Sequence, residues 1–250
     1  MTQNSKTNNS SSREEFVYEG RDLEAMNFAE NYHRWVLSKF DGYINSNILE
    51  VGAGSGSFSK LIIEKYPNNL LTSLEPSNEM YPLLEKNLKG VGKNVILHKS
   101  YTNEIVKDLK DKKISAIIYN NVLEHIENDQ EEIKLAYDIL EKDGYILTFS
   151  PALPALYGKL DKKIGHYRRY SLNEMKVKLV DSGFEVVEAY YFDFVGMILW
   201  WIKFKLLGSD EIGSGNVALF DKYLVPVLRS IEPSKLLPIG KNIVVIGKKI

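Results

Sequence analysis

Short apolar runs and helically spaced apolar positions alternate along most of this chain. Runs bounded by glycine, proline or charged residues predict strands at 47–51, 70–74, 94–98, 114–119, 145–149, 184–192 and 243–246. Apolar positions that recur at helical spacing predict helices at 21–40, 57–65, 77–88, 127–140 and 171–182. Because strands and helices alternate, we expect an α/β fold in which a mostly parallel sheet carries helices on both faces.

Two long stretches interrupt this alternation, at 151–170 and 193–240. Each follows a strand in the C-terminal half, where loops of open α/β sheets often lie over the ligand crevice. We therefore expect a substrate loop at 151–170 and a helical insertion at 193–240, before the last strand.

The insertion begins with a segment at 194–207 that is apolar nearly all round, with lysines at one end. Such a helix is buried in its own domain, paired with a second subunit in a homodimer, or laid against a membrane surface, and the pattern leaves all three open. The run is too short to span a bilayer. We expect the insertion to close an acceptor pocket with Trp200 or Trp201 on its wall, so that the acceptor has an apolar portion.

Composition narrows the class of protein. The 250 residues are 44% hydrophobic and 26% charged with a net charge of −1, a globular profile without the basic field that attracts nucleic acid. The chain has no cysteine, which excludes disulfides and thiolate chemistry. Residues 1–15 contain no apolar run, so we expect a disordered tail, no secretory signal and a cytoplasmic protein. We expect a single domain at 16–250, with an N-terminal helical lid at 21–45.

A glycine-rich turn joins the predicted strand at 47–51 to the next helix, in the segment Glu50-Val51-Gly52-Ala53-Gly54-Ser55-Gly56. Glycines let the backbone adopt positive φ and let a ligand approach it closely. The next acid at a strand end is Glu75, about twenty residues further on, a spacing at which a carboxylate can accept two hydrogen bonds from a ribose diol. We expect Glu75 to lie at an exposed edge of the crevice.

The spacing of these glycines discriminates between adenosine-containing ligands. A dinucleotide-binding turn would carry its third glycine at the position of Ser57, and its pyrophosphate would rest on the helix N-terminus. An acid before the turn, here Glu50, suits a ligand with a cationic amine and would repel a pyrophosphate. A nicotinamide-dependent oxidoreductase and a non-catalytic cofactor-binding subunit remain as alternatives.

The glycine turn, Glu75 and the segment Asn120-Asn121-Val122-Leu123-Glu124-His125-Ile126 together resemble class I S-adenosylmethionine-dependent methyltransferases, over roughly residues 45–190. The resemblance is closest to small-molecule methyltransferases with a "VLEHI" segment. It implies a seven-stranded sheet whose last strand is antiparallel, and S-adenosyl-L-methionine as cofactor.

The same resemblance assigns roles around the cofactor. The glycines would pack against its methionine part, Glu50 would hold the amine indirectly, and Glu75 with Pro76 would lie at the ribose. Ser100 and Tyr101 would flank the adenine, and Asn120 and Val122 would line the sulfonium side. Tyr32, on a helix that often closes over the cofactor in such enzymes, completes the expected set of Tyr32, Glu50, Gly52, Gly54, Gly56, Glu75, Pro76, Ser100, Tyr101, Asn120 and Val122.

The loop after the fifth strand carries the candidate acceptor chemistry. It resembles a "D…GH-RRY" segment found in a subset of these enzymes, some of them associated with sugar or lipid-linked glycan pathways. On this basis the candidate catalytic residues in the loop are Asp161, His166 and Tyr167, and His125, which follows the fourth strand near the expected methyl-transfer site, is a further candidate. For His125 we favour a structural hydrogen-bonding role over a catalytic one, because the resembling family carries a histidine here whatever the substrate. Arg168 and Arg169 either bind a phosphate or carboxylate of the acceptor or pair with acidic neighbours.

The acceptor itself is open: a hydroxyl or amine of a small molecule, a sugar or a lipid-linked compound. A hydroxyl benefits from a base, whereas an amine needs only to be neutral. No clustered histidine and carboxylate spacing indicates a metal site. Methyltransferases that bind catechols through Mg²⁺ carry an acid where this chain has Asn120 and Asn121, so we expect metal independence.

Overall fold

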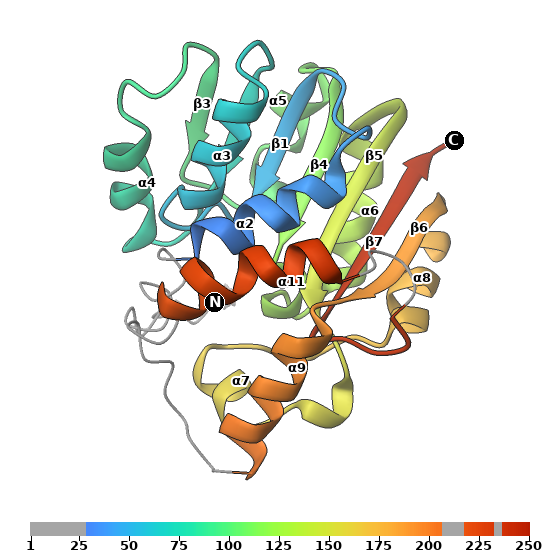
Figure 1. Cartoon of the computed structure of the whole chain (residues 1–250). Coiled ribbons are helices and arrows are strands. Elements are labelled where there is room, and N and C mark those ends of the chain that lie inside the picture. Colours follow the sequence, from blue (N-terminus) through green and yellow to red (C-terminus); the bar gives the residue numbers. More distant parts are fainter. Residues whose placement is uncertain (1–28, 207–217, 233–236) are drawn as a thin grey trace, which may run out of the picture.

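The computed structural model describes residues 29–206, 218–232 and 237–250 (Figure 1). The tail expected at 1–15, the first part of the helix expected at 21–40 and the middle of the insertion lie outside the described residues. In the part that is described, no helix combines the length and the apolar character needed to cross a membrane.

A seven-stranded sheet forms the centre of the domain, in the order β3-β2-β1-β4-β5-β7-β6. β7 runs antiparallel to its neighbours β5 and β6, while β1 to β5 pair in parallel, as the resemblance implied. The strands are β1 (Asn47–Val51), β2 (Leu71–Leu74), β3 (Val95–His98), β4 (Ile114–Asn120), β5 (Leu140–Pro151), β6 (Phe184–Phe192) and β7 (Asn242–Lys249).

Helices cover both faces of the sheet, because successive strand residues point to opposite sides. Ile48 of β1 belongs to a core shared with α2, α3, α4 and α11, whereas Leu49 belongs to a second core shared with α5, α6 and α8. The helices are α2 (Glu30–Leu37), α3 (Ser57–Lys65), α4 (Met80–Leu88), α5 (Val106–Lys110), α6 (Asp129–Ile139), α7 (Lys159–Lys163), α8 (Leu172–Asp181), α9 (Phe194–Trp200) and α11 (Val225–Ile231).

Several elements differ from the sequence expectation by a few residues at their ends, and two differences are larger. β5 begins at Leu140 instead of 145, because Asp143 and Gly144 form an irregularity within the strand instead of a turn before it, with Asp143 at φ 65°. The short helices α5 and α7 were not expected, since five residues are too few for a helical period to stand out.

The insertion is anchored in the domain at both of its described ends. Asp193 adopts φ 62° and its side chain caps α9 by accepting a hydrogen bond from the N–H of Gly196 at 2.8 Å. Further on, Asp221 accepts hydrogen bonds from the backbone N–H groups of Asn31 and Tyr32 at the start of α2, at 3.0 and 2.8 Å. α11 lies beside α2 (Figure 1), and its buried Leu228 belongs to the core. This half of the insertion therefore completes its own domain.

Candidate functional site

All three glycines of the turn after β1 have left-handed backbone conformations, with φ of 69°, 57° and 84° at Gly52, Gly54 and Gly56. A Cβ on Gly52 would lie 2.7 Å from Cγ2 of Val122, and one on Gly56 would lie 2.8 Å from Cδ1 of Leu84. A Cβ on Gly54 would meet no atom within 4 Å. Gly54 is therefore the position at which a ligand can approach the backbone.

Glu75, at the end of β2, is fastened to this turn. Its Oε2 accepts a hydrogen bond from the N–H of Gly54 at 2.7 Å, and its Oε1 accepts one from the N–H of Ser77 at 2.9 Å. The residue is only 5% exposed, so the expectation of an exposed edge position is wrong. Burial raises the pKa of Glu75, and the two backbone donors oppose the rise. Each carboxylate oxygen keeps a lone pair for a further donor.

Glu50 lies beneath the turn and is buried. Its Oε2 accepts hydrogen bonds from the hydroxyls of Ser59 at 2.5 Å and Ser73 at 2.9 Å. Burial raises the pKa of Glu50 to about 7, against the lowering effect of these two hydroxyls and with a smaller contribution from the charge of Glu75. A buried acid behind the glycine backbone fits an indirect role toward a cationic ligand.

Two buried polar atoms that follow strands of the parallel part of the sheet accept or donate no hydrogen bond among the described residues. They are Oδ1 of Asn120, at the end of β4, and Oγ of Ser100, after β3. Since the carboxyl ends of parallel strands share one edge of the sheet, both belong to the edge that carries Gly54. Orphaned buried polar atoms are costly unless a ligand or water satisfies them. Tyr101, which follows Ser100 in the sequence, is half exposed, and Pro76 is half-buried.

Tyr32 lies in an aromatic cluster between α2 and the sheet, with Trp35 and Phe192. Its hydroxyl donates to Oδ2 of Asp193 at 3.0 Å and accepts from Nδ2 of Asn242 at 2.8 Å. These contacts join α2 to the start of the insertion. The cofactor contact expected of Tyr32 stays a prediction.

On the acceptor side, Asp161 of α7 contacts three other residues of the loop after β5. Its Oδ1 lies 3.0 Å from Nδ1 of His166 and accepts a hydrogen bond from Nε of Arg169 at 2.7 Å, while its Oδ2 accepts from the N–H of Gly158 at 2.9 Å. Asp161 is completely buried. It therefore positions His166, while the catalytic role expected of Asp161 stays a prediction.

His166 and His125 lie together, with ring centroids 4.6 Å apart at 80°. Nε2 of His166 is 3.9 Å from Oε1 of Glu124, whose side chain has no exposure. Burial raises the pKa of Glu124 to about 7, although His166 and Arg169 oppose the rise. Burial, with a further contribution from His166, lowers the pKa of His125 to about 3, so His125 is neutral.

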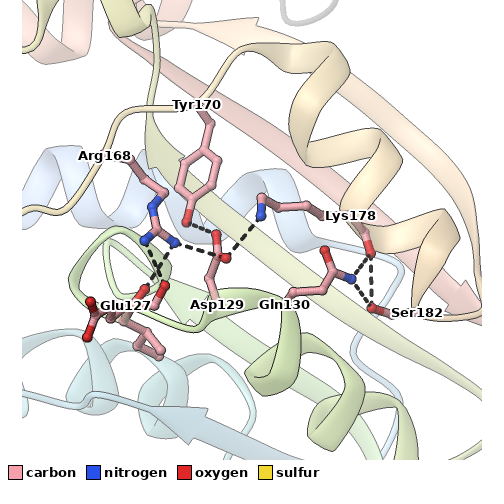
Figure 2. Close-up of polar contacts among 8 residues, drawn as sticks. Glu127, Asp129, Gln130, Arg168, Tyr170, Lys178 and Ser182 are labelled. Carbon is pink, nitrogen blue, oxygen red and sulfur yellow. Dashed lines mark hydrogen bonds and ion pairs between the residues drawn. The ribbon is translucent and has the colours of Figure 1, made fainter.

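Arg168 joins the loop to the start of α6 (Figure 2). Its guanidinium pairs with Asp129 at 2.9 Å and donates to the carbonyl oxygens of Ile126 and Glu127. The same carboxylate accepts from the hydroxyl of Tyr170 at 2.7 Å. Arg168 is thus held by a buried acid, and the alternative that it binds an anion of the acceptor is not supported.

Arg169 is buried and equally occupied. Besides its ion pair with Asp161, its NH1 donates to the carbonyl oxygen of Ala152 at 3.4 Å, and its guanidinium carbon lies 4.3 Å from the ring centroid of Trp200. Both arginines therefore follow the alternative of pairing with acidic neighbours. Trp200 connects α9 to the loop through this stacking, whereas Trp201 is about half exposed.

Tyr167 is half exposed, and its backbone N–H donates to the carbonyl oxygen of Glu124 at 2.8 Å. The loop is thus fastened to the 3-10 turn Leu123–His125 after β4. Glu124 itself had no role in the sequence analysis, although it stands in the segment that carries the resemblance. No spacing rule connects it with His166, because the two are 42 positions apart.

The parallel sheet with an antiparallel seventh strand, the left-handed glycine turn and the acid bound to it define the S-adenosylmethionine-dependent methyltransferase class of α/β domains. A family model described as a methyltransferase domain matches residues 28–189, and the chain belongs to this family. The family and the fold have S-adenosylmethionine as cofactor.

Known proteins similar to this chain include two from Ilyobacter polytropus. Malonyl-[acyl-carrier protein] O-methyltransferase 2 is 31% identical over 157 residues, covering 57% of this chain and 56% of the relative. Malonyl-[acyl-carrier protein] O-methyltransferase 1 is 26% identical over 153 residues, covering 57% and 54%. The chain thus matches a little over half the length of these relatives. A solved S-adenosylmethionine-dependent methyltransferase from Archaeoglobus fulgidus superposes with a TM-score of 0.60 at 20% identity, over 91% of this chain and 98% of that one, and shows the shared fold.

Proposed function

We propose that this protein transfers the methyl group of S-adenosylmethionine to an acceptor bound beside the loop at 151–170. The observation that carries the proposal is the hydrogen bond from Gly54 to Glu75, because it sets an acid with spare lone pairs next to the one open glycine of the turn. When bound, the cofactor supplies a methyl carbon made electrophilic by the positively charged sulfur. The protein has to bind, orient and desolvate the two reactants.

The residues at the sheet edge fit this cofactor. Gly54 would admit its methionine part against the backbone, and the spare lone pairs of Glu75 would accept hydrogen bonds from the ribose hydroxyls. The orphaned Oδ1 of Asn120 would accept from the amine, and the orphaned Oγ of Ser100 would meet the adenine beside Tyr101. The assignments of Asn120 and Ser100 each provide a partner that the buried atom lacks among the described residues.

The acceptor chemistry we favour is an oxygen. The similar Ilyobacter proteins are named as O-methyltransferases, and the acceptor side of this chain has an acid and two histidines, His125 and His166, arranged around one point. An amine acceptor would need no such set, because a neutral amine attacks unaided. A small molecule, a sugar and a lipid-linked compound each fit this chemistry.

We also propose that the acceptor has an apolar part that lies against α9. Exposed apolar side chains gather on this helix and its continuation, and an apolar surface of this kind usually has a partner. They are Ile198, Leu199, Trp201 and Ile202. Replacing Ile198 and Trp201 with serine should raise KM for the natural acceptor and leave cofactor affinity unchanged. A change of oligomeric state, or a loss of liposome flotation, would assign the surface to a homodimer or a membrane instead.

The central test is direct ligand binding followed by transfer. The cofactor-free protein should gain thermal stability with S-adenosylhomocysteine and none with NAD, and calorimetry should show micromolar affinity. Incubation with methyl-labelled cofactor and fractionated cell extract should then place the label in one chemical fraction. Absence of binding to S-adenosylhomocysteine would refute the proposal. Binding without any transfer would indicate a non-catalytic subunit.

A further inference from the structure

Three side chains from distant positions converge next to the proposed methyl-transfer site. Glu124 and His125 come from the turn after β4, and His166 comes from the loop after β5. One potential ligand atom from each lies within 4.8 Å of the other two. The sequence pattern does not show this ligand set, because His166 lies 42 positions after Glu124 and becomes its neighbour only through the fold.

Glu124 is a buried acid whose carboxyl oxygens have no hydrogen-bond partner among the described residues, although the charges of His166 and Arg169 act on it. Both of its oxygens are buried and neither accepts a hydrogen bond of normal geometry from a described residue. The hydroxyl of Ser150 lies beside it but also lacks a hydrogen bond of normal geometry. Native proteins pair buried carboxylates or use them to coordinate metals, since an isolated one is costly. The acid therefore points to a positively charged occupant.

His166 is oriented for ligation by the acid on its other side. Asp161 accepts hydrogen bonds from the Arg169 guanidinium and the Gly158 N–H and is therefore an acceptor here, so Nδ1 of His166 carries the proton toward it. In the neutral ring, Nε2 then presents a lone pair toward Oε1 of Glu124, 3.9 Å away. A carboxylate that fixes the tautomer of a histidine in this way is the common outer partner of metal-bound histidines.

We propose that Glu124, His125 and His166 form a binding site for one divalent transition-metal ion of the Zn²⁺ type, with an open position for an oxygen atom of the acceptor. The proposal rests on the proposed function only for the identity of that fourth ligand. The metal site itself stands on the geometry of the three side chains.

The donor set decides the class of ion. Two imidazole nitrogens and one carboxylate oxygen suit Zn²⁺ and its neighbours, whereas Mg²⁺ prefers oxygen ligands and retains water. Ligand atoms at the usual bond lengths of about 2.0–2.1 Å around a tetrahedral Zn²⁺ lie about 3.4 Å apart. The 3.9 Å between His166 and Glu124 is close to this separation, so the site needs to contract by only a few tenths of an ångström across that pair.

The position of the site indicates how the ion would take part in methyl transfer. Val122, two residues before Glu124, is the residue on which Gly52 of the cofactor-binding turn packs. An ion held here would bind the accepting oxygen close to the cofactor and lower the pKa of a hydroxyl. This is the chemistry that an oxygen acceptor needs and an amine acceptor does not.

The experiment measures metal binding by the full chain, independently of methyl transfer. Chelator-treated protein should bind one equivalent of Zn²⁺ in calorimetry, in the presence of millimolar Mg²⁺, and Co²⁺ should give visible absorption bands of a low-coordinate site. Glu124→Gln and His166→Ala should each weaken Zn²⁺ binding at least tenfold. Asp161→Asn should weaken it by about 10–100-fold, the usual effect of losing an outer carboxylate. His98→Ala is the control: it removes a histidine at the end of β3 and should leave Zn²⁺ affinity unchanged.

Glu124→Gln keeps the shape of the side chain and removes a buried charge, so this variant should fold even if a histidine variant does not. The proposal would be overturned if the wild type bound no Zn²⁺, or if folded Glu124→Gln and His166→Ala variants bound it as well as the wild type. The three side chains would then be a buried polar cluster without a metal. S-adenosylhomocysteine binding is measured on the same samples and should be the same in the wild type and Glu124→Gln. Its loss from the wild type would count against the proposed function and leave the metal site standing.

Discussion

The N–H of Gly54 donates a hydrogen bond to Oε2 of Glu75 at 2.7 Å, so the acid at the end of β2 holds the turn at the end of β1. The same carboxylate accepts from Ser77, at the approach to α4. Glu75 is thus a support of the cofactor-binding edge as well as a candidate ligand of the ribose. Replacing Glu75 should therefore change both the affinity for the cofactor and the free energy of unfolding, whereas replacing a surface acid should change neither.

Glu75→Ala should weaken S-adenosylhomocysteine binding by about 1.5–3 kcal/mol, as expected for lost hydrogen bonds to a charged group. It should also lower the free energy of unfolding by about 1–3 kcal/mol, because the N–H groups of Gly54 and Ser77 lose their acceptor. Calorimetry and chemical denaturation measure the two effects. Glu79→Ala, at an exposed acid one turn further on, is the matched control. Unchanged affinity in Glu75→Ala would mean that another residue binds the ribose.

Two glycines of the same turn should respond differently to alanine. Gly52→Ala combines φ 69° with a Cβ 2.7 Å from Val122, so it should destabilise the fold by about 1–3 kcal/mol, and Val122→Ala in the same chain should restore part of this. Gly54→Ala has a similar φ but meets open space, so it should be less destabilising and still impair cofactor binding. Thermal melts and calorimetry compare them. Equal affinity of Gly54→Ala and wild type would show that the ligand lies elsewhere.

The sequence contains the cofactor half of the site because its determinants are local. The turn at 52–56 lies between a strand and a helix of clear periodicity, and Glu75 follows the next strand, so chain order alone places both at one sheet edge. The seven strands and the antiparallel last strand were implied by the resemblance, and the structure adds the strand order. The burial of Glu75 could not be foreseen, since it depends on how far the turn folds over the acid.

The acceptor half could not be read in the same way, because its determinants are distant pairs. Arg168 and Asp129 are 39 positions apart, and nothing in either segment indicates their ion pair. The partners of Arg169 and of Glu124 are equally non-local. For the same reason the insertion looked like a lid, while Asp221 shows that part of it caps α2. Residue types and order predict local structure, whereas charge pairing depends on the completed fold.

The Asp129 network should make stability depend on acid pH. Burial alone would raise the pKa of Asp129, but hydrogen bonds from Tyr170, Lys178 and Arg168 outweigh it and lower the pKa below 3.8 (Figure 2). A carboxyl with a lowered folded-state pKa contributes stability above its unfolded pKa and loses it as pH falls through the folded value. Asp129→Asn should therefore lower the melting temperature at pH 7, and the difference from wild type should shrink below about pH 4.

Asp138→Asn is the control for this effect, because Asp138 is an exposed acid on the same helix. It should change the melting temperature little at either pH, as is usual for surface ion pairs. An Asp129→Asn difference that stays constant between pH 7 and pH 3 would contradict the ionised network. The contribution of Asp129 to the melting temperature would then come from packing alone.

Glu50 should show the opposite pH dependence, because burial raises its pKa from 4.5 to about 7. The native state then holds a proton that the unfolded state releases, so this group makes stability fall as pH rises from about 4.5 to about 7, by at most about 3 kcal/mol. Glu50→Gln removes the titration while retaining an oxygen for the hydroxyls of Ser59 and Ser73. The variant should therefore resemble wild type in stability at pH 5 and be more stable at pH 8.

At pH 8 the Glu50→Gln variant should also bind S-adenosylhomocysteine more weakly, by about 1–3 kcal/mol, because the interaction with a charge across several ångströms of protein has this size. Chemical denaturation and calorimetry at both pH values provide the four measurements. A Gln variant that binds as tightly as wild type at pH 8 would show that the amine is held without the charge of Glu50. A variant less stable than wild type at pH 8 would show that the hydrogen bonds to the ionised acid outweigh its burial.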